Sequence, residues 1–135
     1  MIAGTTANFN GGLFEDTIVP VLARHRVQYQ RQRCIGNGIY GAPIMCDFYL
    51  PQYHLAIECK WQDSAGSVDE KLPYMIENAV HFFECSAMRT VIVIGGRGFR
   101  PGALLWLRSQ TIRPAIAGVF DSAEFISWSA KTFRA

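Results

Sequence analysis

The sequence lacks any apolar run approaching the roughly 20 residues that a membrane-spanning helix needs. It also lacks low-complexity tracts and internal repeats, and 18% of its residues are charged while 50% are hydrophobic. This composition is typical of a globular protein and excludes a disordered chain. At 135 residues the chain is long enough to bury a core, so we expect one domain spanning 1–135, with no membrane partner.

We expect neither a secretory signal nor a disulfide framework. Residues 1–12 carry no basic cluster and no long apolar stretch, so we expect no signal peptide. The four cysteines show no C-x-x-C spacing, and Cys46 and Cys59 fall on apolar faces of predicted strands. Free thiols in a reducing, cytoplasmic setting are the expected state, with disulfide or zinc roles as the less favoured alternatives.

Acidic residues are absent between Thr17 and Cys46 and again between Cys85 and Phe120. Arginines fill both stretches: Arg24, Arg26, Arg31, Arg33, Arg89, Arg97, Arg100, Arg108 and Arg113. The net charge of +2 identifies no partner by itself. Arginine without acidic partners suits bidentate contact with phosphate, so the set as a whole predicts a polyanionic partner. Any one of these arginines, taken alone, can also be interpreted as an ordinary charged surface residue.

Hydrophobic periodicity predicts helices and strands in α/β order. The first expected elements are a helix over 10–24, interrupted or bounded at Pro20, and then strands over 27–35, 39–50 and 54–62. A second helix, opened by a Ser67–Glu70 capping box, precedes a strand over 90–94 that is buried on both faces. A glycine-rich loop over 97–102, a short helix over 103–109, a strand over 115–120 and a last helix capped by Asp121 and Glu124 complete the chain. This order predicts a mixed β-sheet flanked by helices. The aromatic residues mostly fall at core spacing, so no base-stacking platform is expected.

Three charged residues come together if the strands over 39–50 and 54–62 form a hairpin that turns at Gln52 and Tyr53. Tyr49 then faces Ala56, Asp47 faces Glu58, and Met45 faces Lys60. Directly opposed residues have Cβ atoms about 4.5–5.5 Å apart, and like charges in that relation are destabilising. We therefore expect a cation between the two carboxylates, although three solvated charges on an exposed face are the alternative. Two hard oxygen donors favour Mg²⁺ or Mn²⁺.

The aspartate, the hairpin and Glu58-Cys59-Lys60 resemble the motif of the PD-(D/E)xK nuclease superfamily, which has a restriction endonuclease-like fold shared with Holliday-junction resolvases. The proline–aspartate pair is absent, since Pro43 precedes Asp47 by four residues, but only the acid is chemically required. The resemblance extends to residues 12–15, 60–76 and 117–128. It implies an αβββαβ core with a C-terminal α-β-α extension, in a bacterial or phage-type context.

The resemblance also implies metal-dependent cleavage of DNA, giving a 5′-phosphate and a 3′-hydroxyl. Mg²⁺ or Mn²⁺ would be held by Asp47, Glu58, the backbone carbonyl of Cys59 and Glu15, and Lys60 would position the attacking water. Glu15 has the alternative of an acid that stabilises a helix N-terminus. Gln62 shares the face of Lys60 and is a further catalytic candidate, with a polar strand end as its alternative. The expected DNA contacts are Arg31, Arg33, Lys71, Arg97 and Arg100.

A domain of this size has little surface left for reading bases. We therefore expect a homodimer or higher homo-oligomer, a specificity-providing partner protein, or recognition of DNA shape. The apolar residues available for self-association are Leu104, Leu105, Trp106, Leu107, Phe125, Ile126 and Trp128. A Holliday-junction resolvase, a restriction-type or homing endonuclease and a phage-type accessory nuclease all remain open, as do a non-catalytic nucleic-acid-binding module and a plain interaction domain.

Overall fold

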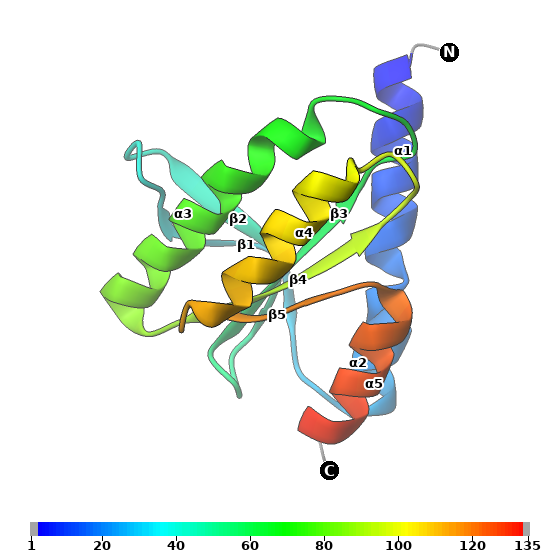
Figure 1. The fold of residues 1–135 in the computed structure, drawn as a ribbon. Coiled ribbons are helices and arrows are strands. Elements are labelled where there is room, and N and C mark those ends of the chain that lie inside the picture. Colours follow the sequence, from blue (N-terminus) through cyan, green and yellow to red (C-terminus); the bar gives the residue numbers. More distant parts are fainter. Residues whose placement is uncertain (1–2, 134–135) are drawn as a thin grey trace.

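The computed structural model describes residues 3–133, and their side chains from Asn10 onward. Its elements are α1 (Ala3–Asp16), α2 (Ile18–Arg24), β1 (Gln30–Asn37), β2 (Pro43–Leu50), β3 (Leu55–Trp61), α3 (Val68–Ser86), β4 (Arg89–Gly95), α4 (Pro101–Ser109), the 3₁₀ turn η1 (Gln110–Ile112), β5 (Ile116–Phe120) and α5 (Ser122–Thr132) (Figure 1). The predicted order of helices and strands is confirmed. None of the helices within residues 3–133 is both long and apolar enough to cross a membrane.

One five-stranded mixed sheet forms the middle layer, with strands in the order β1-β2-β3-β4-β5. The first three strands form an antiparallel meander, whereas β3, β4 and β5 are parallel to one another. The parallel connections run through α3 and α4, as crossovers between parallel strands require. A mixed sheet flanked by helices is the predicted fold class, which is thereby confirmed.

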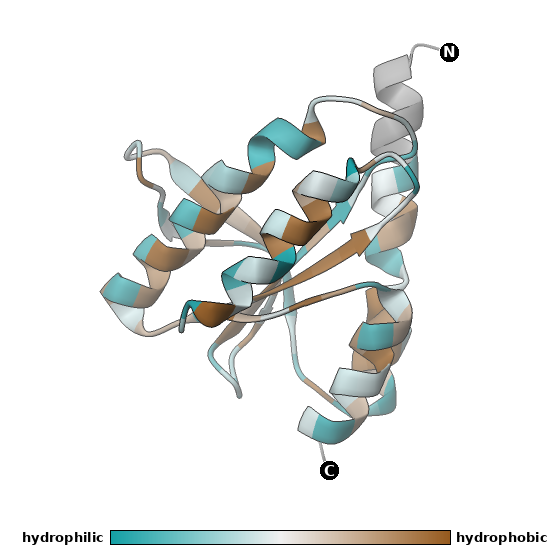
Figure 2. Cartoon of the chain, in the orientation of Figure 1, coloured by the Kyte–Doolittle hydropathy of each residue, from teal (hydrophilic) through white to brown (hydrophobic). Residues whose placement is uncertain are grey.

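Two hydrophobic clusters attach helices to the two faces of the sheet. On one face, Phe14, Ile18, Leu22 and Phe125 bring α1, α2 and α5 onto Phe48, Leu50, Leu55, Ile57, Val91 and Val93. On the other face, α3 and α4 pack against Ile92, Ile94, Ile116 and Val119. Strand β4 contributes to both clusters and is apolar along most of its length, as predicted for a strand buried on both faces (Figure 2).

The expected single helix over 10–24 is two helices, which meet at Thr17. Proline has no backbone N–H, so Pro20 cannot donate to the carbonyl of Asp16, where an uninterrupted helix would need that hydrogen bond. The chain turns instead, and both the N–H and the hydroxyl of Thr17 donate to the carbonyl of Phe14, at 3.1 and 2.6 Å. The break places Glu15 in the last turn of α1.

Strand β1 begins three residues later than predicted, because the N–H of Val27 donates to the carbonyl of Leu22 and closes a turn after α2. Strand β2 begins at Pro43 rather than Ile39, because residues 38–42 form a turn closed by the hydrogen bond from Gly38 N to the Ala42 carbonyl. A strand cannot include residues whose backbone groups are used within a turn.

One predicted helix cap forms and the other does not. At α5 the N–H of Glu124 donates to Asp121 and the N–H of Asp121 donates to Glu124, which is the predicted capping box. At α3 the side chain of Ser67 makes no capping hydrogen bond. The N–H of Val68 donates instead to the carboxamide oxygen of Gln62, at 2.9 Å. The capping prediction for Ser67 was therefore wrong, and Gln62, six residues before Val68, supplies an acceptor at the start of α3.

Candidate active site

The β2–β3 hairpin has the predicted register near its turn, and its ladder ends before the charged residues. Tyr49 pairs with Ala56, and Phe48 with Ile57. No ladder pair is formed beyond Phe48, so the predicted pairing of Asp47 with Glu58 does not occur as a strand pair. The Asp47 carboxylate instead accepts the backbone N–H of Cys59 at 2.7 Å. Asp47 therefore takes the place of a backbone acceptor where the ladder stops.

Glu58 and Lys60 lie on the face of β3 that is turned toward α3. Both side chains are half-buried and line a cavity of about 270 Å³ between the sheet and α3. Side chains alternate along a strand, so Cys59 points to the opposite face and packs against the cluster beneath α1. The alternation predicted for β3 is confirmed.

Glu15 reaches this region from the last turn of α1 and is held by two side chains of β1. Arg31 donates to Glu15 at 3.0 Å and to Asp16 at 2.8 Å. Gln32 donates from one amide nitrogen to Glu15, at 2.9 Å, and to Asp47, at 3.3 Å. The carboxamide of Gln32 thus joins an acid of α1 to an acid of β2.

Sequence reasoning missed Gln32, whose backbone is also unusual. Its φ is +49°, a left-handed conformation that non-glycine residues seldom adopt and that often marks a functional site. Arg31 pairs with Phe48 and Arg33 with Cys46, so Gln32 lies opposite Asp47. The signal that would have revealed it is the register between β1 and β2, which no residue pattern in the sequence specifies.

Burial raises the pKa values of both carboxyl groups. For Asp47 the N–H of Cys59 opposes this effect, the charge of Glu15 adds to it, and Lys60 and Gln32 lower the pKa. For Glu58, burial and then the charge of Asp47 raise the pKa to about 8, while Lys60 lowers it. The two acids therefore lie in a poorly hydrated place where their negative charges repel each other, and a cation there would be attracted to both.

The donor chemistry of these residues fits a hard divalent cation. Asp47 and Glu58 offer carboxylate oxygens, and Glu15 influences the pKa values of both. The side chains of the described residues form no ready-made cluster of three or more metal ligands. Burial and the nearby acids raise the pKa of the Cys59 thiol above its usual range, so it stays protonated. A contribution from Cys59 would therefore come through its carbonyl oxygen, as expected.

The premise that the arginines lack acidic partners was wrong for several of them. Acids from distant segments supply the ion pairs, which are Arg31 with Glu15 and Asp16, Arg100 with Asp69, Arg108 with Glu124, and Arg113 with Glu77. Of the expected DNA contacts, Arg33 lies over the ring of Tyr49 and bonds Gln30, and Lys71 lines the cavity beside Lys60. Arg97 is exposed in the loop after β4.

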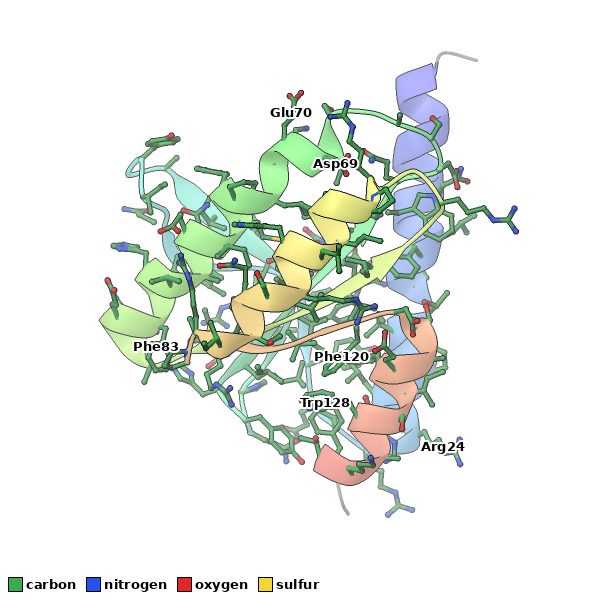
Figure 3. The ribbon with its side chains drawn as sticks, in the orientation of Figure 1. Arg24, Asp69, Glu70, Phe83, Phe120 and Trp128 are labelled. Atoms are coloured by element: carbon green, nitrogen blue, oxygen red, sulfur yellow. The ribbon has the colours of Figure 1, made fainter. Side chains whose placement is uncertain are left out.

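Gln62 is buried and its carboxamide is fully engaged. Besides accepting from Val68, it donates to the carbonyl of Gly98 at 2.9 Å and to Asp69 at 3.2 Å, near the start of α3 (Figure 3). A Cβ on Gly96, which has φ +91°, would lie 2.2 Å from the Gln62 carbonyl oxygen. Gln62 thus joins the loop after β4 to the start of α3, and the glycines of that loop are packing residues.

A comparison with known protein families identifies the superfamily of the chain. Residues 6–133 match the model of a PD-(D/E)XK nuclease superfamily domain. No curated protein and no solved structure matches the chain. The matched segment contains Glu15, Asp47, Glu58 and Lys60. Because the match covers nearly the whole sequence, the chain belongs to the PD-(D/E)XK nuclease superfamily.

Proposed function

We propose that this protein is a metal-dependent endodeoxyribonuclease that hydrolyses phosphodiester bonds of DNA. The observation that supports it best is the meeting of Asp47, Glu58 and Lys60 where the β2–β3 ladder ends. Two acids are held there in a poorly hydrated place, with one lysine on the same strand as Glu58. A fold that only needed stability would gain nothing from burying two acids where the charge of Asp47 raises the pKa of Glu58.

In this proposal Asp47, Glu58, the carbonyl of Cys59 and Glu15 hold one Mg²⁺ or Mn²⁺. The bound metal would polarise a phosphoryl oxygen and lower the pKa of a water molecule. Gln32 and Arg31 keep Glu15 beside Asp47, because each donates a hydrogen bond to its carboxylate. Gln62 has a positioning role, because it supports the strand end that follows Lys60.

Lys60 would act on the phosphate itself. Its ammonium group shares the cavity with Glu58 and lowers the pKa of both acids, which places its positive charge close to each. In the transition state, negative charge increases on the phosphoryl oxygens, and a nearby cation stabilises it. We therefore assign Lys60 to charge stabilisation and to positioning of the attacking water. The exposed Lys71 and Arg97 would contact phosphates farther along the strand.

Self-association is a second part of the proposal. Cutting both strands of a duplex with one site per chain needs two sites of opposite polarity, which a two-fold dimer provides. The apolar run on α4 is partly exposed, as predicted: Leu105 is 72% and Trp106 is 38% exposed, while Leu107 is buried. Ile112 in the following turn is 88% exposed. We propose this surface for a homodimer contact, and light scattering at working concentration tests it.

The nuclease proposal is tested by incubating the purified protein with supercoiled, linear, single-stranded and four-way-junction DNA. We expect cleavage with Mg²⁺ or Mn²⁺, none in excess EDTA, and binding with little turnover in Ca²⁺. Glu58→Gln should abolish cleavage, whereas Glu70→Gln should not, because Glu70 projects outward from α3 (Figure 3). Robust cleavage in EDTA, or by Glu58→Gln, would contradict the proposal. Preference for the junction would indicate a resolvase.

A further inference from the structure

The turn between β1 and β2 is hydrogen-bonded to α3 beside the candidate active site. Asn78, buried on α3, accepts the backbone N–H of Ile39 at 2.9 Å. A Cβ on Gly38 would lie 2.6 Å from the same Asn78 oxygen, so only glycine allows this close approach. The turn, far from α3 in sequence, is therefore held against it (Figure 1).

This attachment stacks two tyrosines at the molecular surface. Tyr40 of the turn lies on Tyr74 of α3, with ring centroids 5.3 Å apart and an interplanar angle of 21°. Tyr40 is 81% exposed, so its outer face meets solvent. Sequence periodicity placed most of the aromatic residues in the core, and this pair lies outside the three core clusters.

Tyr74 also forms part of the wall of the cavity that contains Glu58 and Lys60. Six other apolar side chains line the cavity, and Met45 among them is 50% exposed: Ile35, Ile44, Met45, Met75, Ala79 and Phe82. Thioethers and a tyrosine ring make favourable contacts with planar rings. The volume of about 270 Å³ is near the lower end of the roughly 300–1,000 Å³ of small-molecule pockets, which suits one ring system.

The polar groups of the cavity are arranged around this apolar part. The oxygen of Asn78 is used by Ile39, and its amide nitrogen has no hydrogen-bond partner among the residues that the structure describes. Lys60 and Lys71 add two positive charges to the lining. An occupant with a flat apolar ring, a hydrogen-bond acceptor at its edge and negative charge on either side would match all three features.

We propose that this cavity, with Tyr40 stacked at its rim, binds an unpaired nucleobase of the DNA substrate next to the phosphate that is cut. The proposal rests on the proposed nuclease function and adds the class of substrate. The base would lie against Tyr74 and Met45, its edge would accept from Asn78, and its flanking phosphates would meet Lys60 and Lys71. A paired base cannot enter alone, so the substrate is single-stranded, bulged or branched, or has one base turned out of the duplex.

The test is a double-mutant cycle. It combines the substitution of one side chain in the protein with the removal of one base from the DNA, and compares the effects on binding. Binding is measured by fluorescence anisotropy in Ca²⁺, using a short single-stranded oligonucleotide and the same strand with one abasic residue at each position in turn. For the wild type, loss of one particular base should weaken binding about 5- to 150-fold, the range for one base stacked on an aromatic ring. In Tyr74→Ala the same loss should have little effect.

Two further variants make the cycle decisive. Tyr40→Ala should reduce the effect of base loss in part, and it will fold, because this side chain is 81% exposed. Tyr53→Ala is the matched control, because Tyr53 is also exposed but lies in the β2–β3 turn and does not line the cavity. It should retain the wild-type response. A bulged duplex and a fully paired duplex then distinguish an unpaired base from one turned out by the protein.

The outcomes separate the two proposals. If base loss costs the same in the wild type, Tyr40→Ala and Tyr74→Ala at every position, or if no DNA binds, the base pocket is wrong. If the coupling to Tyr74 is found but no DNA is cut with Mg²⁺, the nuclease function is wrong and the pocket stands. Cleavage without any coupling would overturn the pocket alone.

Discussion

The carboxylate of Asp47 accepts the backbone N–H of Cys59 at the place where the β2–β3 ladder stops, 2.7 Å from nitrogen to oxygen. Asp47 thus has a structural role in addition to its proposed metal role. The hydrogen bond leaves the carboxylate close to Glu58 and replaces a backbone pair that would otherwise close the strands. The chemistry of the site and the divergence of the two strands are therefore linked through one side chain.

Asp47→Ala should be less stable than Asp47→Asn. Both variants remove the negative charge, but only asparagine keeps an oxygen that can accept from Cys59. A buried N–H left without a partner costs about 1–3 kcal/mol, so we expect a difference of that size in the free energy of unfolding. Urea denaturation in EDTA measures it. Equal stabilities would mean that water replaces the lost acceptor. Neither variant should cut DNA.

Gln32→Gly should be more stable than Gln32→Ala, by about 1 kcal/mol. Both variants lose the bridge between Glu15 and Asp47, but glycine adopts the left-handed φ of +49° without steric cost. The same pair of substitutions at Gln30, whose φ is not positive, should give the opposite order. If alanine proved the more stable residue at both positions, the backbone of Gln32 would not be strained.

The stability of the metal-free protein should fall as the pH rises from about 4.5 to about 8. The folded pKa of Glu58 is raised to about 8 from 4.5, so the folded state holds this proton more tightly than the unfolded chain does. The resulting stabilisation is fully present below pH 4.5 and is lost as the pH rises through 8. Melting curves in EDTA measure the slope, and Glu58→Gln should flatten it.

Glu124 provides a control, because its pKa is shifted in the opposite direction to that of Glu58. The Arg108 guanidinium and then the N–H of Asp121 lower the pKa of Glu124 to about 2. Its contribution is present above pH 4.5 and is lost as the pH falls toward 2. Glu124→Gln should therefore leave the slope between pH 4.5 and 8 unchanged. A wild-type slope of the wrong sign in that interval would show that Glu58 is ionised in the metal-free protein.

Lys60→Ala should lower turnover about 10²- to 10³-fold while DNA affinity in Ca²⁺ stays close to that of the wild type, because its charge acts mainly in the transition state. Lys71 lines the same cavity and is exposed, so Lys71→Ala should weaken DNA binding more than it lowers turnover. Single-turnover kinetics and anisotropy separate the two effects. Unchanged turnover in Lys60→Ala would make Lys60 an ordinary strand residue.

Structural features that depend on only a few neighbouring residues were predictable from the sequence. The pairing of Tyr49 with Ala56 follows from the length of the turn and the two-residue alternation of strands. The capping box of Asp121 and Glu124 lies within one helical turn, and the β-branched run of β4 indicated burial on both faces. The same alternation placed Glu58 and Lys60 on one face of β3, which identified the centre of the candidate site.

The tertiary structure decided which distant residues meet there. Gln32 faces Asp47 only because β1 pairs with β2 in one register. Arg31 forms an ion pair with Glu15 only because the first helix breaks at Thr17. The hydrogen bond from Gln62 to the carbonyl of Gly98 and the stacking of Tyr40 on Tyr74 likewise join segments that no local pattern relates. Local hydrogen bonds and periodicity act over a few residues, whereas these contacts depend on how whole helices and strands pack together, and packing gives no period in the sequence.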